Sequence, residues 1–321
     1  MIVVSRFVDW IALCIALGGC SERATGGVAS SAEAEAKWSP RAREIPKLPS
    51  SSRALTSTTR LASVPREAEL ADSQPRERNA TVELSIPPRK QAAESPPSGW
   101  CGETAIQEAL LYFGVWASQR HINRAGKPKH PDLYSSDIPV ALHNLGVEYE
   151  FYSRRPRGLT KYLAWIQAAL KRGEPVLAGV KLLPTQHPEW GLDHFVLVVG
   201  YGPRGLLVNT TWGHRAWAND TTDSGISFKN VTYGIRLRGV VPPGNGIGAR
   251  LSIVDERENA VKLRVICGGL TTGTTYRIEQ WSSASDQQPL RYEATNALDQ
   301  RIEKLLSLDP THLSRFSCTR Q

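Results

Sequence analysis

The sequence lacks several features that would assign a chain at once to a large class of proteins. None of its apolar runs reaches the roughly 20 residues that a transmembrane helix needs. Its His, Cys, Asp and Glu residues form no cluster with the spacing of a metal site, and no internal repeat is visible. These absences argue against a helical membrane protein, a metalloenzyme and a repeat protein, and we expect neither a metal nor another cofactor.

Charge of one sign is not concentrated in any region. The formal net charge is +8, but the excess of Lys and Arg is spread along the 321 residues. The densest cluster is the sequence RRPR at residues 154–157. Because nucleic-acid-binding proteins usually gather positive charge on one face or one helix, we interpret this cluster as a solvated loop and expect no nucleic-acid partner.

Residues 1–20 predict a signal peptide. Arg6 supplies a positive charge, residues 7–17 supply the apolar segment, and the sequence LGGC ends at Cys20. This ending resembles the lipobox of bacterial lipoproteins, which implies that Cys20 is lipidated and that the protein is anchored in the bacterial cell envelope, facing the periplasm or the surface. An ordinary secretory signal peptide is the alternative.

Residues 21–95 are rich in Ala, Ser, Glu, Arg and Pro, and their few apolar residues follow no persistent period. Such a segment cannot bury enough apolar surface to offset the entropy that it loses on ordering. We expect a disordered tether that lets the folded part reach away from a membrane anchor. A propeptide is the alternative, because residues 81–86 alternate like a short strand that would dock on the folded part.

Residues 96–240 have the pattern of a globular domain. A helix is expected over residues 101–113, where apolar residues lie at helical spacing before Gly114. Strands are expected at residues 175–183, 194–199, 206–209 and 231–240. Because the helices come first and the strands cluster later, the pattern favours an α+β fold.

The sequence PPGNG at residues 242–246 marks a boundary, and residues 241–321 predict a small β-rich domain. The sequence GLTTGTTY at residues 269–276 resembles a loop and strand of fibronectin-type sandwich modules. Residues 299–308 fit a helix as well as a strand. The second domain is therefore expected to be small and β-rich, and a fibronectin-like sandwich is the form that this resemblance implies.

The five cysteines fall into different settings. Cys267 and Cys318 lie in the same C-terminal region and would form a disulfide in an oxidising compartment. With Cys20 lipidated, Cys101 is left without a partner. A free thiol in an exported protein calls for an explanation, and a nucleophile provides one; a buried, inert cysteine is the alternative.

Cys101 stands in the sequence SGWCGET, immediately before the predicted helix. The N-terminus of a helix and a nearby imidazolium can lower the pKa of a thiol from about 8.5 to ~3.5–7.5, so we expect a thiolate nucleophile. Glu103 would oppose a thiolate, unless it returns to the backbone as a capping group.

His194 begins an apolar strand, and Asn209 ends the following one. In this pattern His194 would be the general base, and Asn209 would fix the orientation of its ring. His214 is the competing histidine. Asp193 is the alternative acid, but adjacent residues of a strand point to opposite faces, so it is expected to face away.

The oxyanion of a tetrahedral intermediate would need two donors. The main-chain N–H of Cys101 supplies one. A side-chain donor normally lies shortly before the nucleophile, and Gln91 is the nearest upstream glutamine.

Around these residues the chain resembles the bacteriocin-processing (double-glycine leader) cysteine peptidases, a papain-like group. The shared segments are CG at residues 101–102, GEPV at 173–176, HFV at 194–196 and VN at 208–209. The family usually has Pro where this chain has Glu103, Asp where it has Asn209, and Gln where it has Ser95. The resemblance implies a papain-like domain, in which the nucleophile helix packs on an antiparallel sheet.

We therefore expect an exported cysteine peptidase that cleaves amide bonds of peptides or proteins through Cys101, His194 and Asn209. An amide transferase or cell-wall amidase of the same fold is one alternative. A catalytically inactive binding lipoprotein is the other. The expected partners are a peptide or protein substrate and, through the lipid anchor, a membrane; the sequence leaves the oligomeric state open.

Overall fold

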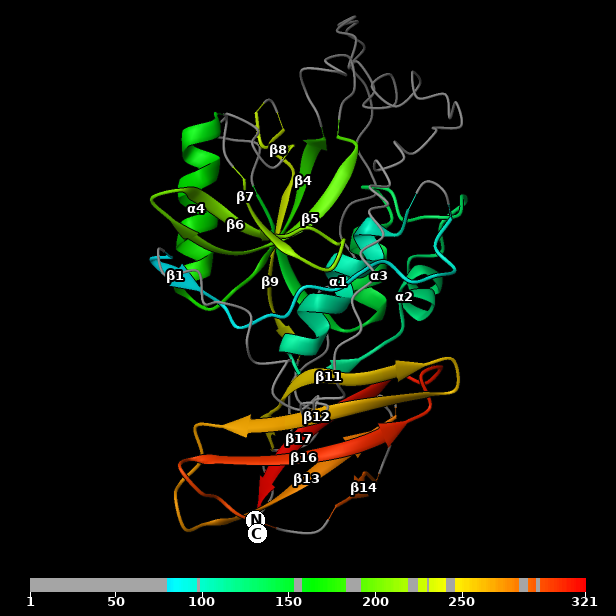
Figure 1. Cartoon of the computed structure of the whole chain (residues 1–321), viewed down its shortest axis with the longest axis vertical. Coiled ribbons are helices and arrows are strands. Elements are labelled where there is room, and N and C mark those ends of the chain that lie inside the picture. Colours follow the sequence, from blue (N-terminus) through cyan, green and yellow to red (C-terminus); the bar gives the residue numbers. More distant parts are fainter. Residues whose placement is uncertain are drawn as a thin grey trace, which may run out of the picture. The chain divides into compact units, whose positions relative to one another are not determined.

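The computed structural model describes residues 80–96, 99–152, 158–182, 192–218, 225–229, 231–240, 246–282, 288–292 and 295–321 (Figure 1). The predicted signal peptide with Cys20, the charged cluster at residues 154–157 and the boundary at 241–245 lie outside the described residues. The mixture of helices and antiparallel strands confirms the α+β class.

An antiparallel sheet forms the centre of the first half of the fold (Figure 1). Within the described residues its order is β3-β9-β4-β5-β6-β7, with β1 added beside β5 and β8 beside β4. Its strands are β1 (Val82–Glu83), β3 (Val147–Phe151), β4 (Val176–Leu182), β5 (His194–Gly202), β6 (Gly205–Asn209), β7 (Arg215–Ala218), β8 (Ile226–Ser227) and β9 (Gly234–Val240). Strands β4 and β5 are apolar and buried along most of their length, as expected for the middle of a covered sheet.

The helices contribute buried residues to the same hydrophobic core as this sheet. They are α1 (Cys101–Tyr112), α2 (Gln119–Gly126), α3 (Ile138–Asn144) and α4 (Leu159–Lys171). In α1 the apolar residues Ile106 and Leu110 are buried, but so are the polar residues Gln107 and Glu108. Because buried polar groups need hydrogen-bond partners, a further segment must cover the polar side of this helix.

Residues 80–96, here called the N-terminal strap, provide that cover. The main-chain N–H of Arg89 donates to Glu108 at 2.7 Å, and the Arg89 guanidinium donates to Gln107 at 3.3 Å. Leu84 and Ile86 are 8% and 0% exposed and belong to the same core as α1.

The strap also pairs with the sheet. Strand β1 pairs antiparallel with β5, and the N–H of Gln91 donates to the carbonyl of Thr211 at 3.1 Å. The folded part therefore includes residues 80–95, which the composition had assigned to a disordered tether ending at residue 95. The difference arises because partners that are distant in sequence bury the few apolar residues of the strap.

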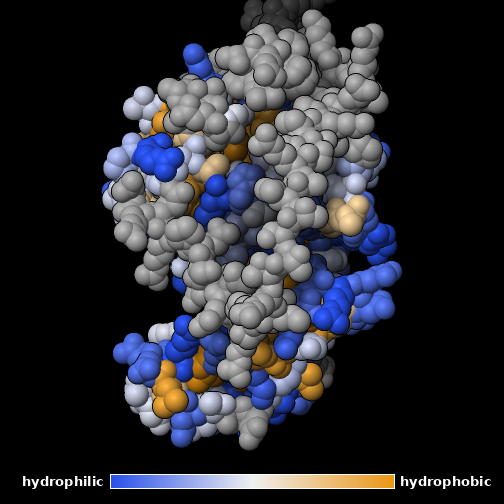
Figure 2. Space-filling view, in the orientation of Figure 1, coloured by the Kyte–Doolittle hydropathy of each residue, from blue (hydrophilic) through white to orange (hydrophobic). Residues whose placement is uncertain are grey.

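The C-terminal residues form two further antiparallel arrangements of strands, with orders β10-β17-β13-β14 and β11-β12-β16. The strands are β10 (Ile247–Gly248), β11 (Arg250–Arg257), β12 (Ala260–Gly268), β13 (Thr275–Trp281), β14 (Leu290–Arg291), β15 (Thr295–Asn296), β16 (Arg301–Leu308) and β17 (Ser314–Arg320). Residues 301–308 are thus a strand, the second of the two alternatives. Figure 2 shows apolar and polar side chains interspersed on this region of the surface.

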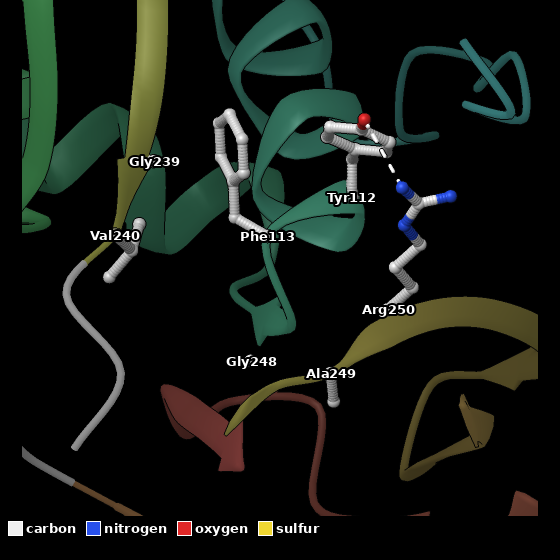
Figure 3. Close-up of a pocket in the computed structure, with 7 residues that line it drawn as sticks. All are labelled: Tyr112, Phe113, Gly239, Val240, Gly248, Ala249 and Arg250. Carbon is white, nitrogen blue, oxygen red and sulfur yellow. Dashed lines mark hydrogen bonds between the residues drawn. The ribbon is translucent and has the colours of Figure 1, made fainter. Parts of the chain in front are cut away.

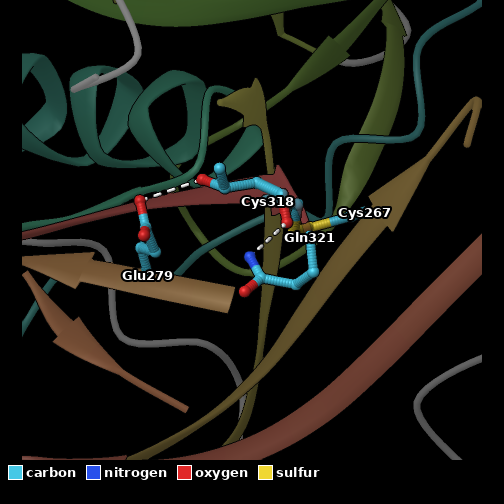
Figure 4. The surroundings of a disulfide bond; sticks show 5 residues. Cys267, Glu279, Cys318 and Gln321 are labelled. Carbon is cyan, nitrogen blue, oxygen red and sulfur yellow. Dashed lines mark hydrogen bonds between the residues drawn. A yellow bond between two sulfur atoms is a disulfide. The ribbon is translucent and has the colours of Figure 1, made fainter. Parts of the chain in front are cut away.

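A disulfide joins Cys267 of β12 to Cys318 of β17, so it links the two arrangements (Figure 4). Both cysteines are at most 1% exposed and lie in the second hydrophobic cluster of the chain. Beside the bond, Glu279 accepts a hydrogen bond from Thr319 at 2.9 Å.

The end of α1 contacts the C-terminal strands directly. Strand β2 (Val115–Trp116) pairs with β17, and Trp116 is fully buried with its indole donating to the carbonyl of Pro310 at 3.3 Å. Gly114 has a φ of 76°, and a Cβ there would lie 2.6 Å from the carbonyl oxygen of Ala249, so only glycine fits this approach.

A cavity of about 230 Å³ opens at this contact (Figure 3). Its lining is Tyr112, Phe113, Gly239, Val240, Gly248, Ala249 and Arg250. The Arg250 guanidinium lies over the Tyr112 ring at 4.5 Å and donates to its hydroxyl at 3.3 Å. These two side chains therefore pack against each other and form one wall of the cavity.

Candidate active site

Cys101 is the first residue of α1 and the free cysteine of the described residues. The main-chain N–H groups of Phe195 and Gly102 lie near its sulfur and lower the pKa of the thiol, and a Cβ at Gly102 would lie 3.5 Å from the ring of Phe195. Phe195 directly follows His194 in β5, so the nucleophile lies at the head of the strand that carries the candidate base. The structure thus brings together two residues that are far apart in the sequence.

The thiol of Cys101 is not activated in the way that the sequence led us to expect. The pKa of Cys101 is raised to about 12, chiefly by burial and in smaller part by the nearby carboxylates of Glu103 and Asp132. The two main-chain donors lower it only in part. In the resting site Cys101 is therefore a neutral thiol rather than a thiolate, because desolvation of the charged form outweighs the N-terminus of the helix.

Glu103 is fully buried on α1. Its carboxylate is not only a capping group of this helix, as predicted, because it also has partners outside α1. Its Oε1 accepts hydrogen bonds from Asn123 at 2.7 Å and from the main chain of Leu133 at 3.0 Å. Burial raises the pKa of Glu103 to about 7, against the effect of these donors. This carboxyl group consequently titrates in the neutral range, close to the nucleophile.

His194 is 6% exposed, and the exposed Trp212 stacks on its ring with centroids 4.9 Å apart. Its Nε2 lies 3.3 Å from the carbonyl oxygen of Thr210 and 3.4 Å from the hydroxyl of Thr211. Burial lowers the pKa of His194 to about 4, although the carbonyl of Thr210 favours the charged ring. The imidazole is therefore neutral at physiological pH.

The contact with Thr210 also assigns the tautomer of His194. A carbonyl oxygen only accepts hydrogen bonds, so the proton of the neutral ring must be on Nε2. The other nitrogen, Nδ1, then carries the lone pair that can take a proton.

Asn209 ends β6 and is fully buried, but its side chain serves other partners. Its Nδ2 donates to the carbonyl of Ile86 at 3.0 Å, and its Oδ1 accepts from Arg215 at 3.2 Å. This differs from the predicted role on the His194 ring. The reason is the register: Asn209 pairs with Leu197, three positions beyond His194, and an odd offset places a side chain on the opposite face of the sheet.

Gln91, the predicted oxyanion side chain, lies next to the nucleophile turn. Its Oε1 accepts from the N–H of Trp100 at 2.8 Å, and its Nε2 lies 3.5 Å from the hydroxyl of Thr211. Gly99 has a φ of 89°, and a Cβ there would approach Gln91 Oε1 to 2.8 Å. Glycine at this position thus admits the glutamine, although Gln91 and Cys101 are ten positions apart in the sequence.

The remaining sequence candidates lie outside this arrangement. Asp193 accepts a hydrogen bond from the N–H of Leu182 at 2.9 Å, and His214 is exposed in the turn before β7. Sequence reasoning missed Thr210 and Thr211, which contact the His194 ring. The available signal was their position between a strand end and the sequence WG.

The described residues hold neither a metal-binding cluster nor a membrane-spanning helix. Their His, Cys, Asp and Glu side chains contain no group of three or more that could hold a metal ion. No helix among these residues is long and apolar enough to span a membrane.

A half-buried cysteine at the start of a helix, beside a strand that begins with histidine, is the arrangement of a cysteine hydrolase. Residues 83–234 match the sequence model of the Peptidase_C39 like family. The matching stretch runs from β1 to the first residue of β9 and contains Gln91, Cys101 and His194. The match supports a papain-like cysteine peptidase. No curated protein matches the chain.

Proposed function

We propose that the protein is a cysteine peptidase that cleaves amide bonds of peptides or proteins, with Cys101 as nucleophile and His194 as general base. The observation that carries this proposal is the packing of the start of α1 on β5, where a Cβ at Gly102 would lie 3.5 Å from the ring of Phe195. It brings the nucleophile beside Phe195, the residue next to His194. The Nε2 atom of His194 is already held by the carbonyl of Thr210.

The reaction would start from a neutral pair. His194 Nδ1 takes the proton of the thiol as the sulfur attacks the substrate carbonyl, and the resulting imidazolium returns that proton to the leaving amine. An acyl-enzyme remains on Cys101. In the second half His194 removes a proton from water as the water oxygen bonds to the acyl carbon. The carbon–sulfur bond then breaks, the carboxylic acid product leaves, and the imidazolium returns the proton to the sulfur of Cys101.

The oxyanion of each tetrahedral intermediate would be stabilised by the N–H of Cys101 and the amide of Gln91. Support for Gln91 comes from its hydrogen bond to Trp100, which holds it beside the nucleophile turn. A preorganised donor of this kind stabilises charge that develops only in the transition state.

We also propose export to the bacterial cell envelope, with residues 1–20 as signal peptide and Cys20 as the lipidated residue. The proposed substrate is accordingly a peptide or protein of the envelope. The papain-like arrangement of the first half and a sandwich in the second half are part of the same proposal.

The test is alkylation of the full chain with iodoacetamide between pH 5 and pH 9, with the site mapped by mass spectrometry. His194→Ala is expected to slow alkylation of Cys101 about 100-fold, the lower range for loss of a general base. His143→Ala, on α3, is the matched control and should leave the rate unchanged. Equal rates in wild type and His194→Ala would contradict the proposed peptidase function and favour the alternative, a catalytically inactive binding lipoprotein.

Product analysis then separates hydrolysis from transfer. Digestion of casein in the presence of a peptide amine gives new carboxyl termini if water is the acceptor. New amide bonds to the added amine would instead assign a transferase.

A further inference from the structure

Thr211 adopts a backbone conformation that is costly for its residue type. It lies in the turn between β6 and β7 with a φ of 67°, in the left-handed region, and it is fully buried. A β-branched residue is a genuine outlier there, and such a conformation costs on the order of 1–3 kcal/mol. Glycine or asparagine would fill this turn at lower cost, so the threonine side chain must contribute something else.

The hydroxyl of Thr211 stands between the two side chains on which the proposed reaction depends. Its Oγ1 lies 3.4 Å from Nε2 of His194 and 3.5 Å from Nε2 of Gln91. Its main-chain carbonyl accepts the N–H of Gln91 at 3.1 Å, which anchors the strap to the same turn. The hydroxyl and the backbone of one residue thus hold both partners.

We infer that Thr211 is a positioning residue that orients the ring of His194, in place of a triad side chain, and couples it to Gln91. This inference rests on the function proposed above. A hydroxyl oxygen has two lone pairs, so it can accept from the Nε2–H of His194 and from the amide of Gln91 at once. The carbonyl of Thr210 adds a second acceptor on the same His194 nitrogen.

This arrangement has a chemical consequence for both partners. Two acceptors on Nε2 fix the tautomer that leaves Nδ1 basic, and they strengthen when the ring takes the proton of the thiol. The amide plane of Gln91 is fixed at both ends, because its Oε1 is held by Trp100. A substitution that removes only the hydroxyl should therefore disturb the base without unfolding the turn.

Three substitutions at residue 211 separate positioning from a structural role. Thr211→Val keeps the branched shape and the strained backbone but has no hydroxyl. Thr211→Ser keeps the hydroxyl. Thr211→Gly relieves the backbone and removes the hydroxyl, so a gain in stability with a loss of reactivity would be specific to positioning. Thr272→Val, in an exposed turn of the C-terminal region, is the control for the same chemical change.

The measurements are the iodoacetamide alkylation rate of Cys101 at pH 6.5, the urea midpoint, and the ¹⁵N chemical shifts of the His194 ring in the full chain. We expect Thr211→Val and Thr211→Gly to lower the rate about tenfold, as for loss of one buried hydrogen bond. Their Nε2 shift should show a weaker hydrogen bond, because only the carbonyl of Thr210 then accepts from the His194 ring. Thr211→Ser should retain most of the rate and the Nε2–H signal.

Two results would overturn the inference: an unchanged Nε2 shift and rate in Thr211→Val, or a loss of rate in Thr211→Ser equal to that in Thr211→Val. His194→Ala keeps the two proposals apart. If that variant alkylates slowly while Thr211→Val behaves as wild type, the peptidase stands and the role of Thr211 falls. If His194→Ala alkylates normally, the proposed function itself falls.

Discussion

The side-chain oxygen of Gln91 accepts a 2.8 Å hydrogen bond from the main-chain N–H of Trp100, the residue immediately before Cys101. The bond connects the N-terminal strap to the turn that presents the nucleophile. It leaves the N–H₂ group of the same amide as the part of Gln91 that can donate to a substrate.

Gln91→Glu preserves the acceptor for Trp100 but removes the donor. We expect casein hydrolysis to fall about 100-fold, as for loss of one oxyanion donor, while iodoacetamide alkylation of Cys101 stays near the wild-type rate, because alkylation forms no oxyanion. Ser95→Ala, which removes another hydroxyl bonded to Gln91, is the control. Equal hydrolysis by wild type and Gln91→Glu would exclude Gln91 from the oxyanion site.

Glu103→Gln should flatten the dependence of stability on pH. Burial raises the pKa of Glu103 from its ordinary value of 4.5 to about 7, so the folded state holds this proton more tightly than the unfolded state. The stabilisation is complete below pH 4.5 and is lost as the pH rises through 7. The urea midpoint of the wild type should therefore fall between pH 4.5 and pH 7, and that of Glu103→Gln should fall less over the same range.

Some slope should remain in Glu103→Gln, because burial also raises the pKa of Glu108, to about 8. Glu258→Gln, in an exposed turn, serves as the matched control. The same Glu103→Gln variant should alkylate several-fold faster at pH 8.5, since an anionic charge beside Cys101 is gone. Parallel pH profiles for wild type and Glu103→Gln would contradict both expectations.

Asn209→Ala should loosen the strap rather than disable the base. The variant loses the donor to Ile86 and leaves that buried carbonyl with Arg215 as its described partner, at an expected cost of about 1–3 kcal/mol. Hydrogen exchange at the amides of Leu84 and Gln91 should speed up, whereas the Nε2–H signal of His194 should persist. Asn144→Ala, which removes an exposed donor, is the control.

The triad that the sequence predicted remains testable with the same variant. A loss of the Nε2–H signal in Asn209→Ala, with hydrogen exchange of the strap unchanged, would return the orienting role to Asn209.

Removal of the disulfide should destabilise the C-terminal strands. Cys267 and Cys318 are separated by 51 residues, and the chain-entropy description gives about 4 kcal/mol for a loop of that length. Cys267→Ala/Cys318→Ala should therefore unfold at lower urea concentration than the oxidised wild type, and wild type treated with dithiothreitol should match it. An unchanged midpoint in both samples would contradict this expectation.

The elements that could be predicted from sequence are those in which the local pattern and the tertiary environment agree. The helix at residues 101–113 and the strand that begins at His194 have clear apolar periods, and each also lies in the core. The strap has only the short alternation of residues 81–86, of which Leu84 and Ile86 are buried, and long-range hydrogen bonds hold the rest of it. Composition therefore assigned it to the tether.

The site shows the same limit at the level of single residues. Cys101 and His194 could be found because each begins an element, and Gln91 because an oxyanion donor was sought upstream. The face of the sheet occupied by Asn209 depends on its pairing with Leu197, and sequence order does not reveal that register. The neutral state of the thiol depends on burial, which likewise arises only in the folded chain.

Strand β17 pairs with β2, directly behind the helix that carries Cys101, and the C-terminal cluster includes Leu111 of that helix together with Trp116. During synthesis the ribosome adds residues 314–320 about two hundred residues after α1. The C-terminal end of the nucleophile helix therefore lacks its contacts with the C-terminal cluster while the first half of the chain is being synthesised. A polypeptide interrupted before β17 would carry every residue of the proposed chemistry, and its first core would still hold Ile106 and Leu110, but Leu111 and Trp116 would lack their partners in the C-terminal cluster. Full support of the nucleophile helix therefore depends on completing the strand farthest from it in the sequence.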